Sequence, residues 1–192
     1  MPTVLAACSR TDTHFIVLQE SSCPIQSRIM SHQTIKVMHS WDGVWRGQGT
    51  NHERQTFNAE LVARTLFGGK STLVWFSARG LDGTIYHEEV ALLGATMGPD
   101  LHMTSANSNL PFVQQFSTIA HASESSKNEV IFHFGNVVAG DTFRETVAFE
   151  AIDPQAIKVT FSWGLPGEDF AERSSVMLSP ATRELPPECP LR

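Results

Sequence analysis

Trp41-Asp42-Gly43-Val44-Trp45-Arg46-Gly47-Gln48-Gly49 is the stretch that decides how the rest of the chain is interpreted. A Gly-x-Trp step opens an extended segment, and two more glycines follow at alternate positions. Glycines inside a strand are typical of places where the strand bends or where another backbone comes close. The stretch therefore predicts the first strand of a β-structure.

Short segments of alternating apolar and polar residues follow, and turn signals separate them. The pattern is clearest at 157–163, where apolar and polar side chains alternate at every position. Strands at a spacing of roughly 8–12 residues indicate a sandwich or a barrel, and a sandwich needs longer crossing connections. Because the connections here are short hairpins, we predict an all-β fold: a single antiparallel up-and-down barrel of about 8–10 strands. The main turn signals are Gly68-Gly69, Asp82-Gly83, Gly98-Pro99-Asp100, Gly140-Asp141 and Asp153-Pro154.

The predicted barrel domain covers residues 33–180. Residues 1–32 show no sustained periodicity and are expected to form a loosely attached extension, while the proline-rich residues 181–192 are expected to form an irregular tail. A short helical turn within 34–41 would plug one end of the barrel.

Composition and charge argue against several classes of protein. The chain of 192 residues has a net charge of -6 and no run of Lys or Arg, so we predict no nucleic-acid partner. No apolar stretch approaches the roughly 20 residues of a membrane helix, and no secretory signal is recognisable. Cys8, Cys23 and Cys189 form no CxxC pair, which indicates reduced thiols in a cytoplasmic protein.

The Gly43-x-Trp45 step resembles the opening motif of the calycins, the superfamily of lipocalins and fatty-acid-binding proteins. In that superfamily the Trp lies across the closed end of the barrel, beside an Arg from the last strand. The resemblance implies structural roles for Gly43 and Trp45, and it implies that Arg173 covers the Trp45 ring. Such a cation–π contact contributes about 0.5–2 kcal/mol.

The run Val44-Trp45-Arg46-Gly47-Gln48-Gly49 is also similar to the start of nitrobindin and related bacterial lipocalin-like proteins. That resemblance implies haem or gas binding, with the haem held by a His near the C-terminus. This chain has no His after His133. We therefore predict no cofactor and keep haem binding as an alternative.

Three strands carry polar candidates for a site. His87 and Glu89 share one face of a strand, about 6.6–7 Å apart, but no H-x-H pair accompanies them and we predict no metal site. Glu145 lies on a face that is otherwise apolar, so its carboxyl group would be partly buried and would need a partner. We expect Arg173 or His133 to supply that partner.

Aromatic residues at strand spacing would line the interior. They are Trp75, Phe132, Phe161 and Trp163, with Phe134 beside them. Most aromatic residues in strands are simply core, but a barrel of this size has one interior, and some of them must face it. With His87, Glu89, His133 and Glu145 they make up the predicted ligand-binding set.

These observations favour a non-catalytic protein that binds a small hydrophobic or amphipathic ligand inside the barrel. The alternative is an enzyme that uses acid–base chemistry in the same barrel, with Glu145, His133, His87 and Glu89 as candidate groups. That alternative requires at least two of the four to face inward within reach of each other or of one bound molecule. Ligand identity and a homodimeric state stay open.

Overall fold

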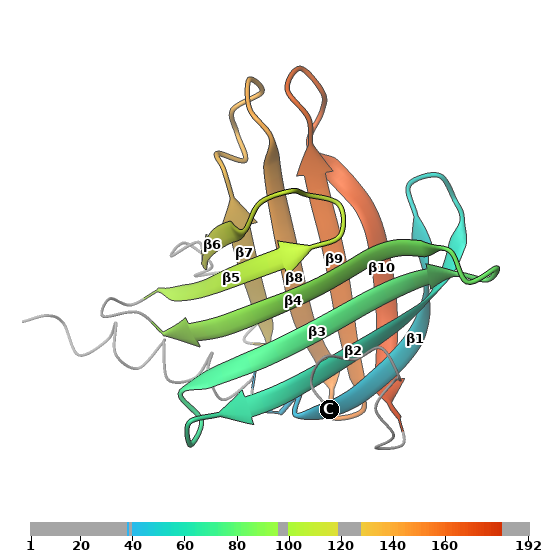
Figure 1. Cartoon of the computed structure of the whole chain (residues 1–192), viewed down its shortest axis with the longest axis vertical. Coiled ribbons are helices and arrows are strands. Elements are labelled where there is room, and N and C mark those ends of the chain that lie inside the picture. Colours follow the sequence, from blue (N-terminus) through green and yellow to red (C-terminus); the bar gives the residue numbers. More distant parts are fainter. Residues whose placement is uncertain (1–37, 39, 96–99, 119–127, 182–192) are drawn as a thin grey trace, which may run out of the picture.

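The computed structural model describes residues 38, 40–95, 100–118 and 128–181, and it shows ten strands that close into one barrel (Figure 1). The strands are β1 (Gly43–Asn51), β2 (Thr56–Leu66), β3 (Ser71–Gly80), β4 (Ile85–Ala95), β5 (Leu101–Asn107), β6 (Gln114–Thr118), β7 (Glu129–Phe134), β8 (Arg144–Asp153), β9 (Ala156–Gly164) and β10 (Ala171–Pro180).

Each strand pairs antiparallel with its neighbours in sequence, and β1 closes the barrel against β10. The register of that closure runs from Trp45 opposite Pro180 to Asn51 opposite Ser174. The predicted all-β, up-and-down barrel is thus confirmed, at the upper end of the expected strand number. Among the described residues, the weakest seam joins β6 and β7, whose pairs there are Ser117–His133 and Thr118–Phe132.

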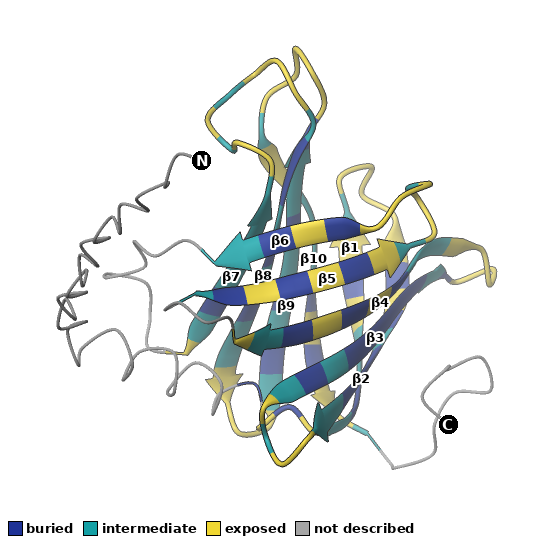
Figure 2. Cartoon of the chain, turned by 60° about the vertical axis from the view of Figure 1, so that its left-hand side comes forward, coloured by how far each residue is buried: buried dark blue, intermediate teal, exposed yellow. Residues whose placement is uncertain are grey.

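Alternating burial along the strands shows which face points inward. In β5, Leu101, Met103 and Ser105 are buried while the residues between them are exposed, and Figure 2 shows this as alternating blue and yellow bands. The inward residues of all ten strands contribute to one apolar core. Burial of apolar surface at about 25 cal/mol per Å² is the main stabilising contribution to such a fold.

Two glycines of the opening stretch allow β1 to pair closely with β10. A Cβ atom at Gly47 would lie 1.9 Å from the Met177 carbonyl oxygen, and one at Gly49 would lie 2.6 Å from the Ser175 carbonyl oxygen. The ring of Phe57 also covers Gly49, at 2.5 Å from the same hypothetical Cβ. The alternate glycines therefore mark a close approach of another backbone, as the sequence predicts.

The end of the barrel near Trp45 is closed by the residues that precede β1. Met38 and Trp41 are each 1% exposed, and the Trp41 ring packs 5.1 Å from the ring of Phe149. The Trp45 indole N–H donates a 2.8 Å hydrogen bond to the Trp41 carbonyl oxygen. The backbone N–H of Trp41 also bonds to the Met38 carbonyl oxygen, although most of the helical turn expected within 34–41 lies outside the described residues.

The expected contact between Arg173 and Trp45 is wrong. Trp45 lies opposite Pro180 at one end of β10, whereas Arg173 lies at the other end, beside a register shift between Glu172 and Ser174. The Arg173 guanidinium covers the Trp163 ring instead, at 4.4 Å from its centroid. The resemblance located the Trp correctly and the Arg at the wrong end of the barrel.

The extension expected at 1–32 and most of the tail expected at 181–192 fall outside the described residues, so those domain limits stay predictions. Within the part of the chain that the structure describes, no helix has the length and apolar character to cross a membrane.

Candidate functional site

A cavity of about 380 Å³ opens at the barrel end opposite Trp41 and Trp45. The connections β1–β2, β3–β4, β5–β6, β7–β8 and β9–β10 gather at this end, and the last two project at the top of Figure 1. Residues of eight strands and four of these connections line the cavity: Asn51, His52, Phe57, Phe76, Ala78, Tyr86, His87, Asn107, Asn109, Leu110, Phe143, Glu145, Phe161, Trp163, Leu165, Arg173 and Ser174.

Aromatic side chains form most of the cavity wall. Phe76 belongs to β3 and Phe161 to β9, and their ring centroids are 5.2 Å apart. The His87 ring joins them, at 5.4 Å from Phe161 and 6.1 Å from Phe76. Tilted arrangements of this kind are favourable geometries for aromatic pairs. Phe57, Phe143 and Trp163 complete this aromatic part of the lining.

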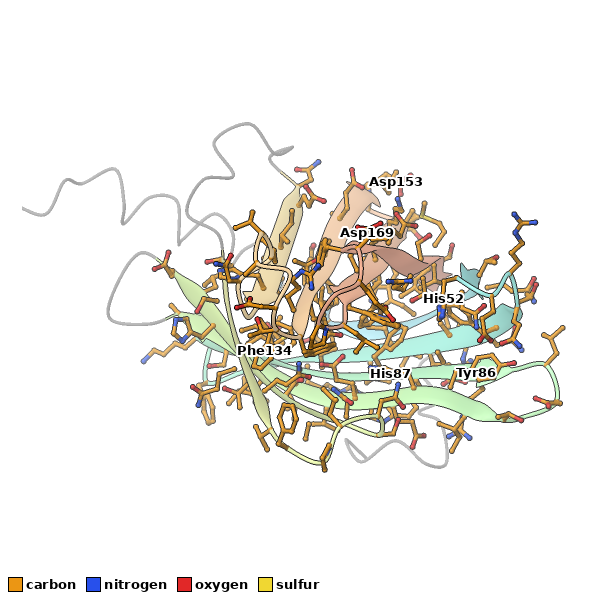
Figure 3. All side chains as sticks on the ribbon, turned by 90° about the horizontal axis from the view of Figure 1, so that it is seen from above. His52, Tyr86, His87, Phe134, Asp153 and Asp169 are labelled. Atoms are coloured by element: carbon orange, nitrogen blue, oxygen red, sulfur yellow. The ribbon has the colours of Figure 1, made fainter. Side chains whose placement is uncertain are left out.

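A β-bulge turns two consecutive residues of β4 toward the cavity. The register between β3 and β4 shifts where Ala78 faces His87 and Arg79 faces Ile85, which leaves Tyr86 as the extra residue. Strict alternation places Tyr86 on the outer face. The bulge instead brings it to the cavity with His87, and its ring lies so close to Gly80 that a Cβ there would be 2.7 Å from the Tyr86 hydroxyl. Figure 3 locates Tyr86, His87 and His52 in the view from above.

A chain of buried amide and carboxyl groups crosses the interior from β5 to β8. Asn107 Nδ2 donates to Gln114 Oε1 at 2.9 Å, and Gln114 Nε2 donates to Glu145 Oε2 at 2.9 Å. Gln114 is fully buried, and Glu145 is 8% exposed. The hydrogen bond from Gln114 therefore reaches past β7 and ties β6 to β8 beside the weakest seam of the barrel.

His87 contacts two further polar side chains. Its Nε2 lies 3.4 Å from Glu89 Oε2, and its Nδ1 lies 3.2 Å from Asn109 Nδ2. The Asn109 amide can only donate to Nδ1, so this geometry favours the tautomer with the proton on Nε2, directed at Glu89. His87, Glu89, Asn107, Gln114 and Glu145 together are called the polar cluster below.

The pKa of Glu145 is raised, chiefly because burial removes water from the carboxylate. The hydrogen bond from Gln114 lowers this pKa, the charge of Glu89 raises it, and His87 lowers it. Around the carboxyl group, Gln114 and His87 therefore oppose the larger effect of burial, while the Glu89 carboxylate adds to it. This is an unusually poor environment for an ionised acid.

The rim of the cavity carries the cations. Arg173 lies flat on Trp163, donates from Nε to the Trp163 carbonyl oxygen at 3.1 Å and pairs with Glu168 at 3.5 Å. The His52 ring also packs edge-on against the Trp163 ring, with their centroids 5.6 Å apart. The rim is thus held by packing and hydrogen bonds that do not involve the polar cluster.

Arg144 fixes the β9–β10 connection from outside the barrel. Its guanidinium donates to the carbonyl oxygens of Glu168, Leu165 and Thr142 at 2.6, 3.2 and 3.2 Å. Because Leu165 lines the cavity, this buried arginine holds part of the cavity mouth in place.

The structure brings together some of the predicted site residues and separates others. His87, Glu145, Phe161 and Trp163 line the cavity. Glu89 faces inward behind His87, since it is 6% exposed and bonds to that ring. The partner expected for Glu145 was wrong, because Gln114 supplies it.

Three predicted site residues do not reach the cavity. Trp75 lies on the outer face of β3 and packs with Val44 and Val62 in a separate cluster, because Phe76 takes the inner face. His133 lies between inward Phe132 and Phe134, so its side chain is on the outer face of β7, where its Nδ1 is 3.5 Å from the Gly135 carbonyl oxygen. Phe132 does face inward, but it is fully buried in the core.

Sequence reasoning missed Gln114, Asn107 and Asn109. Asn107 and Asn109 belong to a polar connection, which looks like an ordinary turn in sequence. Gln114 alternates with Phe116, and that spacing was the available signal that its amide faces inward.

His87 is a poor ligand for a haem iron. Both ring nitrogens of His87 already have partners in Asn109 and Glu89, and a buried carboxyl group beside it is a poor neighbour for an apolar macrocycle. The described residues also contain no group of three or more His, Cys, Asp or Glu side chains placed to hold a metal ion.

Comparison with solved structures shows the same architecture at low identity. The crystal structure of Rv2717c from M. tuberculosis aligns with a TM-score of 0.56 and 12% identity, over 77% of this chain and 97% of that one. The barrel EF1p2_mFAP2b bound to DFHBI aligns with a TM-score of 0.45 and 10% identity, over 77% of this chain and 99% of that one. The redesigned barrel mFAP1 bound to DFHBI aligns with a TM-score of 0.42 and 10% identity, over 74% and 97%.

No protein-family model and no curated protein matches the chain. The structural likeness extends to the fold, and with the closed ten-strand topology it shows that this chain forms a calycin-like barrel.

Proposed function

We propose that this protein binds a small, largely apolar molecule in the cavity at the open end of the barrel, without transforming it. The observation that carries the proposal is the composition of that cavity. Its walls are aromatic, while a few polar groups converge at one place inside, around Glu145 and His87. Apolar surface with a small number of fixed polar groups is the usual make-up of small-molecule sites.

The dimensions and rigidity of the cavity support this proposal. A volume of about 380 Å³ lies near the lower end of the range for ligand pockets, roughly 300–1,000 Å³. The Phe76–Phe161–His87 packing and the contacts of Arg144 with the β9–β10 connection hold the walls in place. Affinity then comes from apolar burial, and little is lost in ordering the protein.

Titration with N-phenyl-1-naphthylamine, an uncharged fluorophore that brightens in apolar surroundings, tests the proposal. We expect saturable brightening with one site per chain. Ala78→Phe fills the cavity, since Ala78 lines it, and should abolish the signal. Ala106→Phe is the matched control because Ala106 is exposed on β5 and does not line the cavity.

Urea unfolding of both variants shows that each is folded. Equal brightening by the wild type and by folded Ala78→Phe would place the probe elsewhere and reject the cavity as the site.

The alternative function, acid–base catalysis on a molecule held in the same cavity, retains one specific observation. Three of its four candidate groups face inward, with His87 Nε2 and Glu89 Oε2 3.4 Å apart and Glu145 close by. Binding without turnover is favoured because both ring nitrogens of His87 already have hydrogen-bond partners within the protein. Recovery of a chemically altered compound after incubation, lost in His87→Gln, would favour the enzyme. The cytoplasmic location and the oligomeric state stay predictions.

A further inference from the structure

We propose that the cavity selects a protonated amine: a small aromatic or alicyclic molecule with one ammonium group, for which Glu145 is the counter-ion. This inference rests on the proposed binding function and adds the chemical class of the ligand. A ligand of this class differs in charge from a fatty acid or another anion.

The hydrogen bonds of Glu145 leave one oxygen for a ligand. Oε2 accepts from Gln114 Nε2 at 2.9 Å, while the described residues provide no hydrogen bond to Oε1. The side chain is 8% exposed, and the surface that it exposes lines the cavity. A buried carboxylate is stabilised by a donor or a cation at each oxygen, and the described residues provide no hydrogen bond at Oε1.

The charges around Glu145 favour a cation in the interior. Glu89 adds a second carboxylate close enough to raise the pKa of Glu145. The His87 ring is placed toward other partners: its Nε2 lies 3.4 Å from Glu89 Oε2 and its Nδ1 lies 3.2 Å from Asn109 Nδ2. Among the described residues that line the cavity, Arg173 carries the only cation that is permanent, and it pairs with Glu168 at the rim.

Aromatic rings near Glu145 suit the rest of an amine ligand. Trp163 lies directly opposite Glu145 in the β8–β9 register, and Phe161 is the next inward residue along β9. The faces of such rings attract ammonium groups. Trp163 already makes this type of contact with Arg173 on one face. An ammonium group at Oε1 would therefore have a counter-ion on one side and aromatic surface around its carbon skeleton.

The energetics favour an amine over an acid. Folding has already removed water from Glu145, so an amine needs to lose only its own hydration to form the pair. A carboxylate ligand at the same place would be repelled by the charges of Glu145 and Glu89. An uncharged ligand avoids this repulsion but leaves the ionised Glu145 without a partner.

Amine binding should also depend on pH. Burial, followed by the charge of Glu89, raises the pKa of Glu145, and Gln114 and His87 oppose the shift. The cavity lining carries three other titratable or charged groups, which are Tyr86 on the β4 bulge, Arg173 at the rim and His52. The affinity for an amine should rise with pH as Glu145 ionises, while the affinity for an uncharged analogue should change little.

The test compares three probes of one shape: 1-naphthylmethylamine, 1-naphthylmethanol and 1-naphthoate, each titrated calorimetrically into the full-length protein at neutral pH. We expect the amine to bind at least about tenfold more tightly than the alcohol, the change that one hydrogen bond to a charged group can produce. The carboxylate should bind most weakly. Glu145→Gln keeps an acceptor for Gln114 and should remove the preference for the amine.

Glu150→Gln is the matched control. Glu150 lies on the outer face of the same strand β8, opposite Glu129, and its substitution changes the net charge equally. It should leave the amine preference intact. A preference that falls equally in both variants would indicate a long-range charge effect and overturn the assignment of Glu145.

The other outcomes separate the two proposals. Equal binding of all three probes, or tighter binding of the carboxylate, would overturn the inference while leaving the cavity as a ligand site. If none of the probes binds and N-phenyl-1-naphthylamine also fails to bind, both the inference and the proposed function are wrong.

Discussion

Gln114 supports Glu145 from one side, and its replacement gives the most informative test of the polar cluster. Gln114→Leu keeps a side chain of similar size in a fully buried position, so it opens little empty space. It removes the donor to Glu145 Oε2 and the acceptor for Asn107 Nδ2, both at 2.9 Å. The substitution therefore changes hydrogen bonding much more than packing.

The expected cost follows from these two contacts. A hydrogen bond to a charged group contributes about 1.5–3 kcal/mol, and a neutral one about 0.5–1.5 kcal/mol. We expect Gln114→Leu to lower the free energy of unfolding by about 2–4 kcal/mol at neutral pH. In the Glu145→Gln background both lost bonds are neutral, so the cost of the same substitution should fall by about 1 kcal/mol or more.

The pH dependence identifies the charged partner. The pKa of Glu145 is raised in the folded state, so its titration stabilises the fold fully below the unfolded pKa, and this contribution is lost as the pH rises through the folded pKa. The bond from Gln114 lowers the folded pKa, so its loss raises that pKa further. The cost of Gln114→Leu should therefore be smallest below the ordinary Glu value of about 4.3 and should increase as the pH rises.

Urea unfolding across this pH range measures the cost, provided that the dependence on urea is the same for both proteins. A cost under about 1 kcal/mol that does not change with pH or with Glu145→Gln would refute the proposed role of this hydrogen bond.

Three further substitutions separate structure from binding. Gly47→Ala should destabilise the fold by about 1–3 kcal/mol in thermal or urea unfolding, because its Cβ would lie 1.9 Å from a β10 carbonyl oxygen. Gly140→Ala is the control and should not destabilise the fold, because the space around Gly140 is open. Equal effects of the two substitutions would contradict the close approach of β1 and β10. Trp75→Phe should cost about 0.5–3 kcal/mol of stability yet leave probe affinity unchanged, since Trp75 packs on the outer face, and a large loss of affinity would place it at the site. Arg173→Met should remove a cation–π contact of about 0.5–2 kcal/mol and change the fluorescence of Trp163, and an unchanged spectrum would argue against the 4.4 Å stacking.

Much of the fold could be predicted because a barrel is specified locally. Turn signals such as Asp82-Gly83 end each strand, and Gly83 does adopt a positive φ of 87°. Period-two alternation then separates two faces. What alternation cannot state is which face is the inner one when both carry aromatic residues, and this is why Trp75 was placed inside although Phe76 takes that position.

The site was harder to predict because it depends on contacts between distant strands. A single bulge in β4 reverses the orientation of Tyr86, and its position follows from pairing with β3. The bond from Gln114 to Glu145 joins residues 31 positions apart across a strand that pairs poorly with β6. The need for a partner at Glu145 could be foreseen from its apolar neighbours, but the identity of that partner required the closed barrel.

Trp45 and Arg173 show how much of the structure a short sequence motif can predict. Its position at the closed end could be expected from the resemblance, because a Trp at the start of the first strand lies at that end in any closure of β1 against the last strand. The position of Arg173 depends on where β10 begins and on its register shift, which no residue near Trp45 determines.

The most direct test of the ligand site is a crystal of the protein soaked with 4-bromo-1-naphthylmethylamine, with the bromine located by its anomalous scattering. We predict one bromine site inside the barrel among Phe76, Phe161 and Trp163, with the ammonium nitrogen at hydrogen-bond distance from Glu145 Oε1. Bromine found only on the outer surface, such as the groove beside Trp75 and Val90, with no probe in the cavity, would contradict the account.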